Sequence, residues 1–194
     1  MKNSIRITGG SLKGQKIPFD FRSSLRPTSS KLREVLFNWL QFEIQKCNCL
    51  DLFAGTGALG IEALSRGAQR SIFIESNKKS FLLLRNSIKE LGLEKNSKVI
   101  FKNGINWIKD NDLSNIDLIF ADPPFNQDIE KKILEIFHKN ENLKLSCKIY
   151  IEFNKFTKID LPNSFKIIKD KMIGDVRALL TVSYTHLRAH ETRF

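Results

Sequence analysis

The segment Asp122-Pro123-Pro124-Phe125 carries the residue types that most directly suggest chemistry in this chain. It follows the apolar run 118–121, which is typical of a buried strand. Each proline fixes its φ at about −65° and lacks a backbone donor, and a residue before proline is disfavoured in helical geometry. We therefore expect the strand to end in a stiff, extended corner that carries one carboxylate and one aromatic ring.

Such a corner suits a planar amino group. Asp122 and the carbonyl of Pro123 can accept its two N–H bonds, and Phe125 can stack on the ring that bears it. An exocyclic base nitrogen is a poor nucleophile because its lone pair is delocalised into the ring. Two aligned acceptors favour its pyramidal, attacking form and the positive charge that develops on it. The alternative for these four residues is a Pro-Pro turn in which Asp122 caps a turn or helix.

A glycine-rich loop, Gly55-Thr56-Gly57-Ala58-Leu59-Gly60, follows the apolar segment 49–53. Asp51 lies near the end of that segment, where it can orient a cationic or amino-bearing ligand. Glu75 closes the next apolar segment, where the dinucleotide fingerprint places an acid for ribose hydroxyls. The same spacing fits a nicotinamide-dependent oxidoreductase. We disfavour that function because the Asp-Pro-Pro-Phe corner has no evident task in hydride transfer.

The order of the expected elements predicts an α/β fold with a doubly wound, mostly parallel sheet. A small hairpin is expected at 5–7 and 15–17, followed by a helix that Ser29 or Ser30 caps. Expected strands alternate with helical segments before two final strand candidates, the full set being 49–53, 71–75, 99–102, 117–122, 147–152, 165–169 and 175–181.

Four polar residues fall at or just past the ends of these expected strands: Asp51, Glu75, Asn103 and Asp122. In open α/β sheets, ligands bind beyond the carboxyl ends of the strands, so these side chains should converge on one site. Two alternatives stay open at this point. Glu75 could be a surface carboxylate, and Asn103 could serve only as a turn or helix cap.

Composition limits the class of protein. The chain has 194 residues, of which 41% are hydrophobic, and this suits one soluble domain of ordinary size. We expect a cytoplasmic protein, since the sequence shows neither a signal peptide nor a membrane span. We also expect a monomer. Cys47, Cys49 and Cys147 are too few and wrongly spaced for a zinc site or a disulfide framework, so we expect free thiols and no metal.

Positive charge is concentrated near the N-terminus. The net charge is +11, and residues 1–40 hold eight basic and two acidic residues, a net of +6. This local excess predicts a nucleic-acid footprint that contacts phosphates without reading sequence. The alternative is an ordinary solvated face of a lysine-rich protein.

The motifs together resemble a known family. Asp51-x-Phe53-x-Gly55-x-Gly57, Glu75 and the segment 122–125 resemble a class I S-adenosylmethionine-dependent methyltransferase that modifies an exocyclic amino group. The segments 6–10, 12–14, 26–28 and 33–39 resemble the bacterial 16S rRNA guanine-N2 methyltransferase family that acts on guanine 966. The resemblance runs from Ile5 to Thr181.

The resemblance implies a Rossmann-like seven-stranded sheet whose last strand is antiparallel. It assigns S-adenosyl-L-methionine as cofactor, bound by Asp51, Phe53, Gly55, Thr56, Gly57, Gly60, Glu75, Asn103 and Asp122. It assigns catalysis to Asp122, Pro123, Pro124 and Phe125. The partner it implies is 16S rRNA or the assembling small ribosomal subunit, contacted by Arg6, Lys13, Lys16, Arg26, Thr28 and Arg33. Whether Asp122 also takes the proton stays open.

We expect three segments: a basic RNA-binding extension at 1–40, a methyltransferase domain at 41–181 and a tail at 182–194. The tail resembles translated sequencing-adapter read-through, so we reject its His186 and His190 as a metal pair. Two other functions remain open. One is a methyltransferase for DNA adenine N6, DNA cytosine N4 or a protein glutamine, and the other is a non-catalytic rRNA-binding assembly factor.

Overall fold

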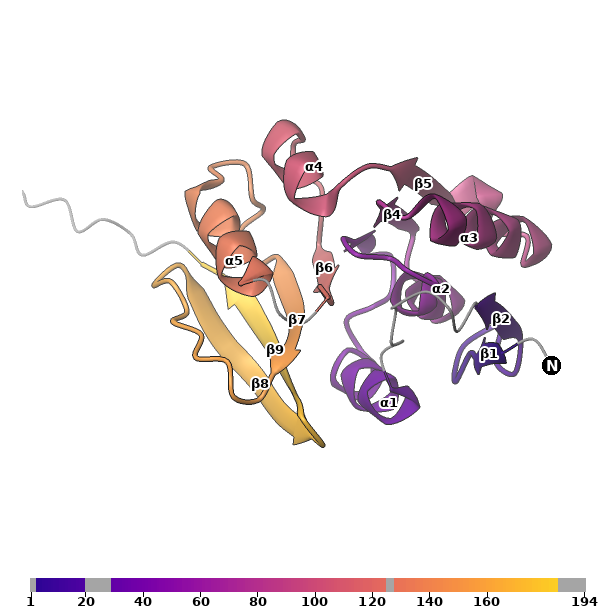
Figure 1. Cartoon of the computed structure of the whole chain (residues 1–194), viewed down its shortest axis with the longest axis horizontal. Coiled ribbons are helices and arrows are strands. Elements are labelled where there is room, and N and C mark those ends of the chain that lie inside the picture. Colours follow the sequence, from indigo (N-terminus) through magenta and orange to yellow (C-terminus); the bar gives the residue numbers. More distant parts are fainter. Residues whose placement is uncertain (1–2, 20–28, 125–127, 185–194) are drawn as a thin grey trace, which may run out of the picture.

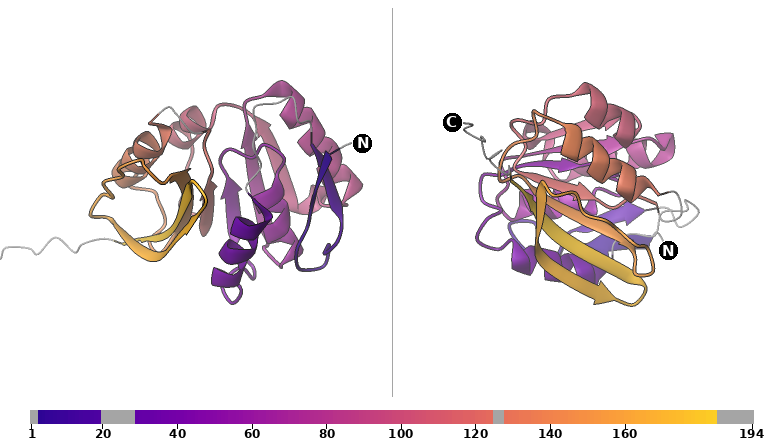
Figure 2. Two further views of the ribbon diagram at one scale, coloured as in Figure 1. Left: turned by 60° about the horizontal axis from the view of Figure 1, so that its bottom comes forward. Right: turned by 90° about the vertical axis from the view of Figure 1, so that its left-hand side faces the viewer.

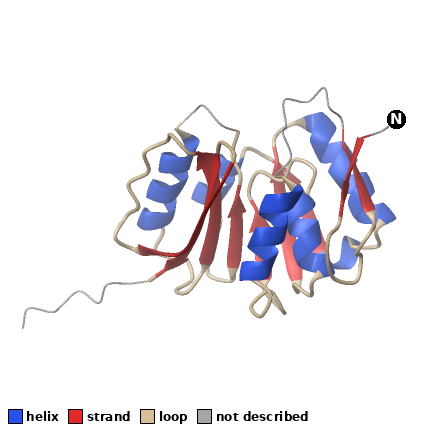
Figure 3. Ribbon diagram, turned by 90° about the horizontal axis from the view of Figure 1, so that it is seen from below, coloured by secondary structure: helices blue, strands red, loops and turns tan. Residues whose placement is uncertain are grey.

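The computed structural model describes residues 3–19, 29–124 and 128–184 of the chain. It shows a seven-stranded sheet covered by helices on both faces, with a separate two-stranded hairpin (Figures 1 and 3). The strands are β1 (Asn3–Arg6), β2 (Lys16–Phe19), β3 (Asn48–Asp51), β4 (Arg70–Glu75), β5 (Ser97–Phe101), β6 (Leu118–Ala121), β7 (Lys148–Asn154), β8 (Phe165–Ile173) and β9 (Val176–Ser183). The helices are α1 (Ser30–Trp39), α2 (Ala58–Ser65), α3 (Lys78–Glu90), the short 3-10 helix η1 (Glu94–Asn96), α4 (Gly104–Asp110) and α5 (Ile129–Lys139).

The large sheet has the strand order β5-β4-β3-β6-β7-β9-β8. Neighbouring strands from β5 to β7 are parallel, whereas β9 runs antiparallel to both β7 and β8. The expected doubly wound fold with a reversed last strand is therefore confirmed. The chain changes direction across the sheet between β3 and β6, the switch point where ligands bind in such folds.

Each face of the sheet has its own hydrophobic core. The first core packs α1, α2 and α3 on the sheet through residues such as Phe37, Ile61 and Leu84. The second packs α4 and α5 through residues such as Ile108 and Phe137. The central strand β6 is buried along its whole length because helices cover both of its faces, which explains why its sequence is continuously apolar rather than alternating.

The N-terminal extension packs into the first core. Ser29 caps α1 by accepting a 3.2 Å hydrogen bond from the Leu32 N–H, as expected. Leu36 and Phe37 of α1 are fully buried with residues of the sheet, so the packing is continuous across the expected boundary at residue 40. The hairpin lies at the opposite end of the molecule from β8 (Figure 2).

The first residues of the expected foreign tail belong to the fold. Val182 pairs with Lys148 in β7, and the Ser183 hydroxyl donates a 2.7 Å hydrogen bond to the Lys144 carbonyl. His186 and His190 lie outside the described residues. Strand β9 therefore extends two residues into the segment that we expected to be non-native.

Cys47, Cys49 and Cys147 are free thiols, and burial raises the pKa of Cys147 to about 12. Within the described ranges, no cluster of His, Cys, Asp and Glu side chains is arranged to hold a metal ion. No helix in that part of the chain is long and apolar enough to cross a membrane.

Candidate active site

The four polar residues expected at strand ends do meet at one edge of the sheet. Asp51 ends β3, Glu75 ends β4, Asn103 follows β5 and Asp122 follows β6. These strands are parallel neighbours in the order β5-β4-β3-β6, so their carboxyl ends lie side by side. We call this the carboxyl edge.

The glycine loop at this edge requires glycine at two positions for different reasons. Gly57 has φ +77° and precedes α2, a left-handed conformation that a side chain would strain. A Cβ added at Gly60 would lie 2.3 Å from the Phe73 ring, so α2 could not approach β4 as closely. Phe53 and Thr56 are half-buried in the same turn. The loop therefore brings bare backbone close to the carboxyl edge.

Asp51 is a buried carboxylate, only 3% exposed, that accepts a 3.0 Å hydrogen bond from the Gly60 N–H. Burial raises the pKa of Asp51 to about 7; the Gly60 N–H opposes this shift, and the charges of Asp122 and Glu75 add to it. A cationic ligand group beside Asp51 would stabilise its ionised form.

Glu75 ties the glycine loop to the end of β4. One carboxylate oxygen accepts the Gly55 N–H at 2.7 Å, and the other accepts the Asn77 N–H at 2.6 Å. A carboxylate has about four lone-pair positions, so each oxygen retains acceptor capacity for a ligand hydroxyl. The side chain is buried, which argues against an ordinary surface carboxylate.

Asn103 caps α4, because its side-chain oxygen accepts a 3.1 Å hydrogen bond from the Asn106 N–H. That oxygen has a second lone pair, so the cap leaves room for one further donor. A Cβ added at Gly104 would lie 2.6 Å from the Leu52 carbonyl oxygen. The glycine thus lets the start of α4 lie against the end of β3.

The Asp-Pro-Pro corner follows β6 as the prolines predict. Asp122 is half-buried, Pro123 is buried and Pro124 is exposed, and all three lie outside regular secondary structure. In the parallel pair β3 and β6, Asp51 is opposite Phe120, and the Leu52 N–H donates a 2.9 Å hydrogen bond to the Phe120 carbonyl, so the corner lies beside the segment that enters the glycine loop. Phe125 lies outside the described residues.

Sequence reasoning missed a buried pair in β7. The Tyr150 hydroxyl donates a 2.7 Å hydrogen bond to Glu152, whose side chain is 2% exposed. Asp122 also contributes to the raised pKa of Tyr150, after burial and Glu152 itself. The available signal was a carboxylate inside the otherwise apolar segment 149–153.

Three of the expected RNA-contacting residues are exposed on the hairpin: Arg6, Lys13 and Lys16. The hairpin turn is fixed to the C-terminal end of α2, where the Leu12 N–H donates a 2.9 Å hydrogen bond to the Ser65 hydroxyl. Helix α2 has eight residues and so separates this turn from the glycine loop by about 12 Å along its axis. Arg26 and Thr28 lie outside the described residues.

Arg33 does not join that exposed set. Its side chain is 2% exposed, with Nη1 3.5 Å from a carboxylate oxygen of Glu62 and Nη2 donating to the Arg6 carbonyl at 3.2 Å. Glu62 is itself fully buried and also accepts hydrogen bonds from the Thr8 and Gly9 N–H groups and from Arg66. In this structure Arg33 helps to fasten the hairpin to the domain, so the expectation that it contacts RNA directly is withdrawn.

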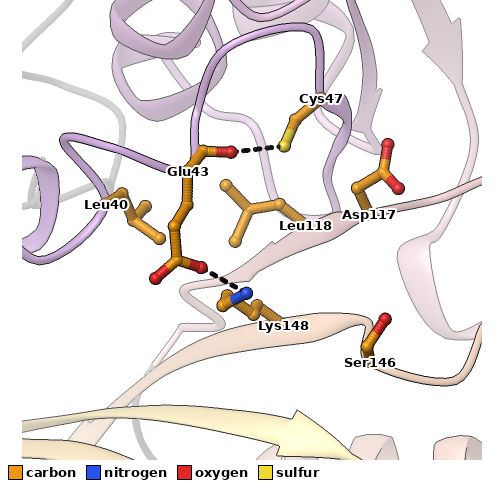
Figure 4. Close-up of a pocket in the computed structure, with 7 residues that line it drawn as sticks. All are labelled: Leu40, Glu43, Cys47, Asp117, Leu118, Ser146 and Lys148. Atoms are coloured by element: carbon orange, nitrogen blue, oxygen red, sulfur yellow. Dashed lines mark hydrogen bonds and ion pairs between the residues drawn. The ribbon is translucent and has the colours of Figure 1, made fainter.

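A small cavity of about 150 Å³ lies at the opposite, amino edge of the sheet (Figure 4). Two charged side chains of its lining, Lys148 and Glu43, pair with each other, and the third, Asp117, pairs with Lys144, which is not part of the lining. The Cys47 thiol donates to the Glu43 carbonyl at 2.8 Å. This edge therefore carries acids already matched by lysines.

Residues 5–182 match the protein family described as Conserved hypothetical protein 95. The chain belongs to this family. A curated relative from Buchnera aphidicola (Acyrthosiphon pisum), named Ribosomal RNA small subunit methyltransferase D, is 40% identical over 95% of this chain and 96% of its own length. The Escherichia coli K12 protein of the same name is 34% identical over 89% of this chain and 86% of its own length.

Solved structures agree with this assignment. The yhhF protein of Escherichia coli superposes with a TM-score of 0.83 at 32% identity, covering 94% of this chain and 99% of that chain. The expected class I methyltransferase fold is thereby confirmed. The family members match nearly the full length of the chain, including the N-terminal hairpin.

Proposed function

We propose that this protein transfers a methyl group from S-adenosyl-L-methionine to the exocyclic N2 of a guanine in 16S rRNA, of the guanine 966 type. The observation that carries the proposal is the Asp122-Pro123 corner placed beside the glycine loop at the carboxyl edge. The names of the relatives support rRNA of the small subunit as the substrate class. The four motif residues do not by themselves choose among planar amino groups.

The residues at the carboxyl edge fit the proposed cofactor. Asp51 is buried beside other acids and has its pKa raised to about 7, so the positive charge of an α-amino group would stabilise it. Glu75 retains acceptor capacity for two ribose hydroxyls, and the Asn103 oxygen retains one lone pair for an adenine amino group. When bound, the cofactor supplies a methyl group activated on a sulfonium sulfur.

The chain's own contribution is positioning and electrostatics. The Asp122 carboxylate and the Pro123 carbonyl would accept the two hydrogens of guanine N2 and direct its lone pair toward the glycine loop. The same two oxygens would stabilise the positive charge that grows on N2 as its bond to the methyl carbon forms and the bond from that carbon to sulfur breaks. N2 then loses one proton, to Asp122 or to water. The target base must be unpaired, because N2 is engaged in a Watson–Crick pair.

The hairpin supports a polymeric substrate. Arg6 and Lys16 are direct cross-strand partners, and like charges in that position repel each other. A phosphate between them would relieve this repulsion. Because the hairpin turn lies about 12 Å from the glycine loop, a nucleic acid that contacts both must extend well beyond one nucleotide.

The test is transfer of labelled methyl groups from S-adenosylmethionine to small-subunit particles that lack the modification, with naked 16S rRNA in parallel. Nucleoside analysis of the product should give N2-methylguanosine with the wild-type protein and none with Asp122→Ala. Asp117→Asn, at the other end of β6, is the matched control and should retain activity. If another methylated nucleoside is found, or if the methyl group is transferred to DNA or protein, guanine N2 is not the target.

The assembly-factor alternative has its own outcome in the same experiment. If Asp122→Ala restores ribosome assembly fully in cells that lack the protein, catalysis is not the function. If the wild-type protein binds no S-adenosylmethionine in calorimetry, the methyltransferase proposal fails as a whole.

A further inference from the structure

The buried pair Tyr150 and Glu152 has a position that the proposed reaction does not yet explain. Burial of a carboxylate is costly unless hydrogen-bond donors compensate for the lost water. The Tyr150 hydroxyl supplies one donor, at 2.7 Å to Oε1 of Glu152. An ionised carboxylate accepts about four hydrogen bonds in all, and among the described contacts the Tyr150 hydroxyl takes one of these positions.

Strand register places Glu152 next to the catalytic corner. In the parallel pair β6 and β7, Phe120 is opposite Tyr150 and Ala121 is opposite Ile151. Phe120 and Tyr150 lie in the first core, whereas Ala121 and Ile151 lie in the second. Because side chains alternate along a strand, the next residues, Asp122 and Glu152, return to the first face on strands about 5 Å apart.

The electrostatics of Tyr150 agree with this placement. Burial and Glu152 raise the pKa of Tyr150 well above its usual value, and Asp122 adds to the shift, so Asp122 lies within electrostatic reach of the pair. The phenol therefore keeps its proton and stays a donor. It fixes one oxygen of Glu152, which limits the rotamers available to the carboxylate.

The base that the corner is proposed to bind has a donor in the matching place. Guanine presents the N2 amino group and the N1–H side by side on its Watson–Crick edge. Adenine and cytosine instead have an unprotonated ring nitrogen next to their amino group, with a lone pair that a carboxylate would repel. An acceptor beside Asp122 can therefore distinguish guanine from both other amino-bearing bases.

We propose that Glu152, held in place by Tyr150, accepts the N1–H of the target guanine and so selects guanine over other bases that carry an amino group. This inference rests on the proposed function, since it takes guanine N2 to be the group held by Asp122 and Pro123. Glu152 is then a specificity residue that touches the substrate, and Tyr150 is a positioning residue.

A pair of substrates that share the 2-amino group but differ at N1 and at position 6 tests this contact when wild type and Glu152→Gln are compared on both. Particles are reconstituted with ligated 16S rRNA carrying either guanine or 2,6-diaminopurine at the target position. The second base retains the 2-amino group but has an unprotonated N1. Methyl transfer to each is measured as kcat/KM for wild-type, Glu152→Gln, Tyr150→Phe and the control Asp117→Asn.

We expect the wild-type enzyme to prefer guanine by about 10³-fold or more, as sites built to hydrogen-bond a substrate group do. Glu152→Gln should bring the preference below about tenfold, because the glutamine amide can donate to the unprotonated N1 of diaminopurine. Tyr150→Phe should lower transfer to guanine while retaining much of the preference. Asp117→Asn should match wild type.

The outcomes separate the two proposals. If wild-type and Glu152→Gln enzymes show the same preference for guanine, Glu152 does not read N1 and the inference fails while the proposed function stands. If the wild-type enzyme methylates neither substrate, the proposed function fails and the inference fails with it. Should Glu152→Gln not fold, Tyr150→Phe decides: a transfer rate to guanine that falls more than the rate to diaminopurine supports the inference, and an unchanged preference overturns it.

Discussion

The two ends of strand β6 carry aspartates whose described neighbours differ. Asp117 precedes the strand, accepts the Asn48 N–H at 2.8 Å and pairs with Lys144. Burial acts to raise the pKa of Asp117, but the Asn48 N–H and Lys144 outweigh it, so the pKa is lowered. Asp122 follows the strand and lies within reach of Asp51, whose pKa burial raises to about 7.

This contrast separates carboxylates that the chain itself neutralises from those that favour a ligand. At the amino edge, Lys148 pairs with Glu43 (Figure 4) and Lys144 pairs with Asp117, so these acids contribute to the fold. At the carboxyl edge, Asp51 and Glu75 accept only backbone N–H groups among their described hydrogen bonds, and each is buried close to another acid. A carboxylate at the carboxyl edge is therefore the one whose ionised form a cation or hydrogen-bond donor of a ligand would stabilise most.

The largest expected effect is on catalysis at the carboxyl edge. Asp122→Asn retains the size of the side chain but weakens its acceptor and removes its charge, so kcat should fall by about 10²–10³. Single-turnover methyl transfer at saturating S-adenosylmethionine measures this. The same substitution at the amino edge, Asp117→Asn, should leave kcat unchanged. Equal losses in the two variants would remove the functional distinction between the edges.

Glu62 extends the comparison to a fully buried acid that the chain does neutralise. Glu62→Gln leaves the buried Arg33 without its ion-pair partner, and the free energy of unfolding should fall by about 3 kcal/mol. Urea denaturation measures the change. Glu43→Gln, which breaks a partly exposed pair, is the control and should cost under about 1 kcal/mol. Similar losses in the free energy of unfolding for both variants would show that burial does not make the Glu62 ion pair more important to stability than an exposed pair.

Asp51 should give the protein a distinctive pH dependence. Its folded-state pKa is raised to about 7, so its contribution to stability is fully present at low pH and is lost as pH rises through that value. Between about pH 6 and about pH 8 the loss should be about 1 kcal/mol. Urea unfolding of wild type and Asp51→Asn across this range measures the difference. Parallel pH profiles for the two proteins would refute the raised pKa.

Asp117 should give a smaller effect of the opposite sign. Because its pKa is lowered in the folded state, its contribution to stability is present above its unfolded-state pKa and is lost as pH falls through the folded-state value. Asp117→Asn should therefore lower stability at neutral pH, by under about 1 kcal/mol for a pair that solvent still reaches, and should make no difference in strong acid. Thermal unfolding at neutral and acid pH tests this sign.

Much of the fold could be predicted from sequence because the central strands are short apolar runs between helical patterns. Strand β8 shows where this approach weakens. It was expected at 165–169 but extends to Ile173, because most of its residues are exposed and it pairs with β9 through its backbone. A lysine-rich edge strand of this kind lacks the hydrophobic alternation that marks a strand end in sequence.

The site was predictable where it depends on strand ends and less so where it depends on neighbours across the sheet. Asp51, Glu75 and Asp122 could be found because parallel strands present their carboxyl ends together. Glu152 lies inside a strand, and its proposed place beside Asp122 follows only when the register of β6 and β7, which ends at Ala121 opposite Ile151, is extended by one residue. Arg33 was misjudged because charge composition does not tell which arginine will be buried against an acid.

The position of β9 has a consequence for the order in which the molecule can form. This strand is the last that the structure describes along the chain, yet it lies between β7 and β8 in the sheet. During synthesis, β8 therefore emerges before the only strand with which it pairs in the described structure. Strand β7 pairs with β6 on one side, and its other side stays unpaired until Val176–Ser183 has left the ribosome. Completion of the fold is thus a late step, and a chain that stops short of β9 would leave both β7 and β8 with unpaired backbone groups.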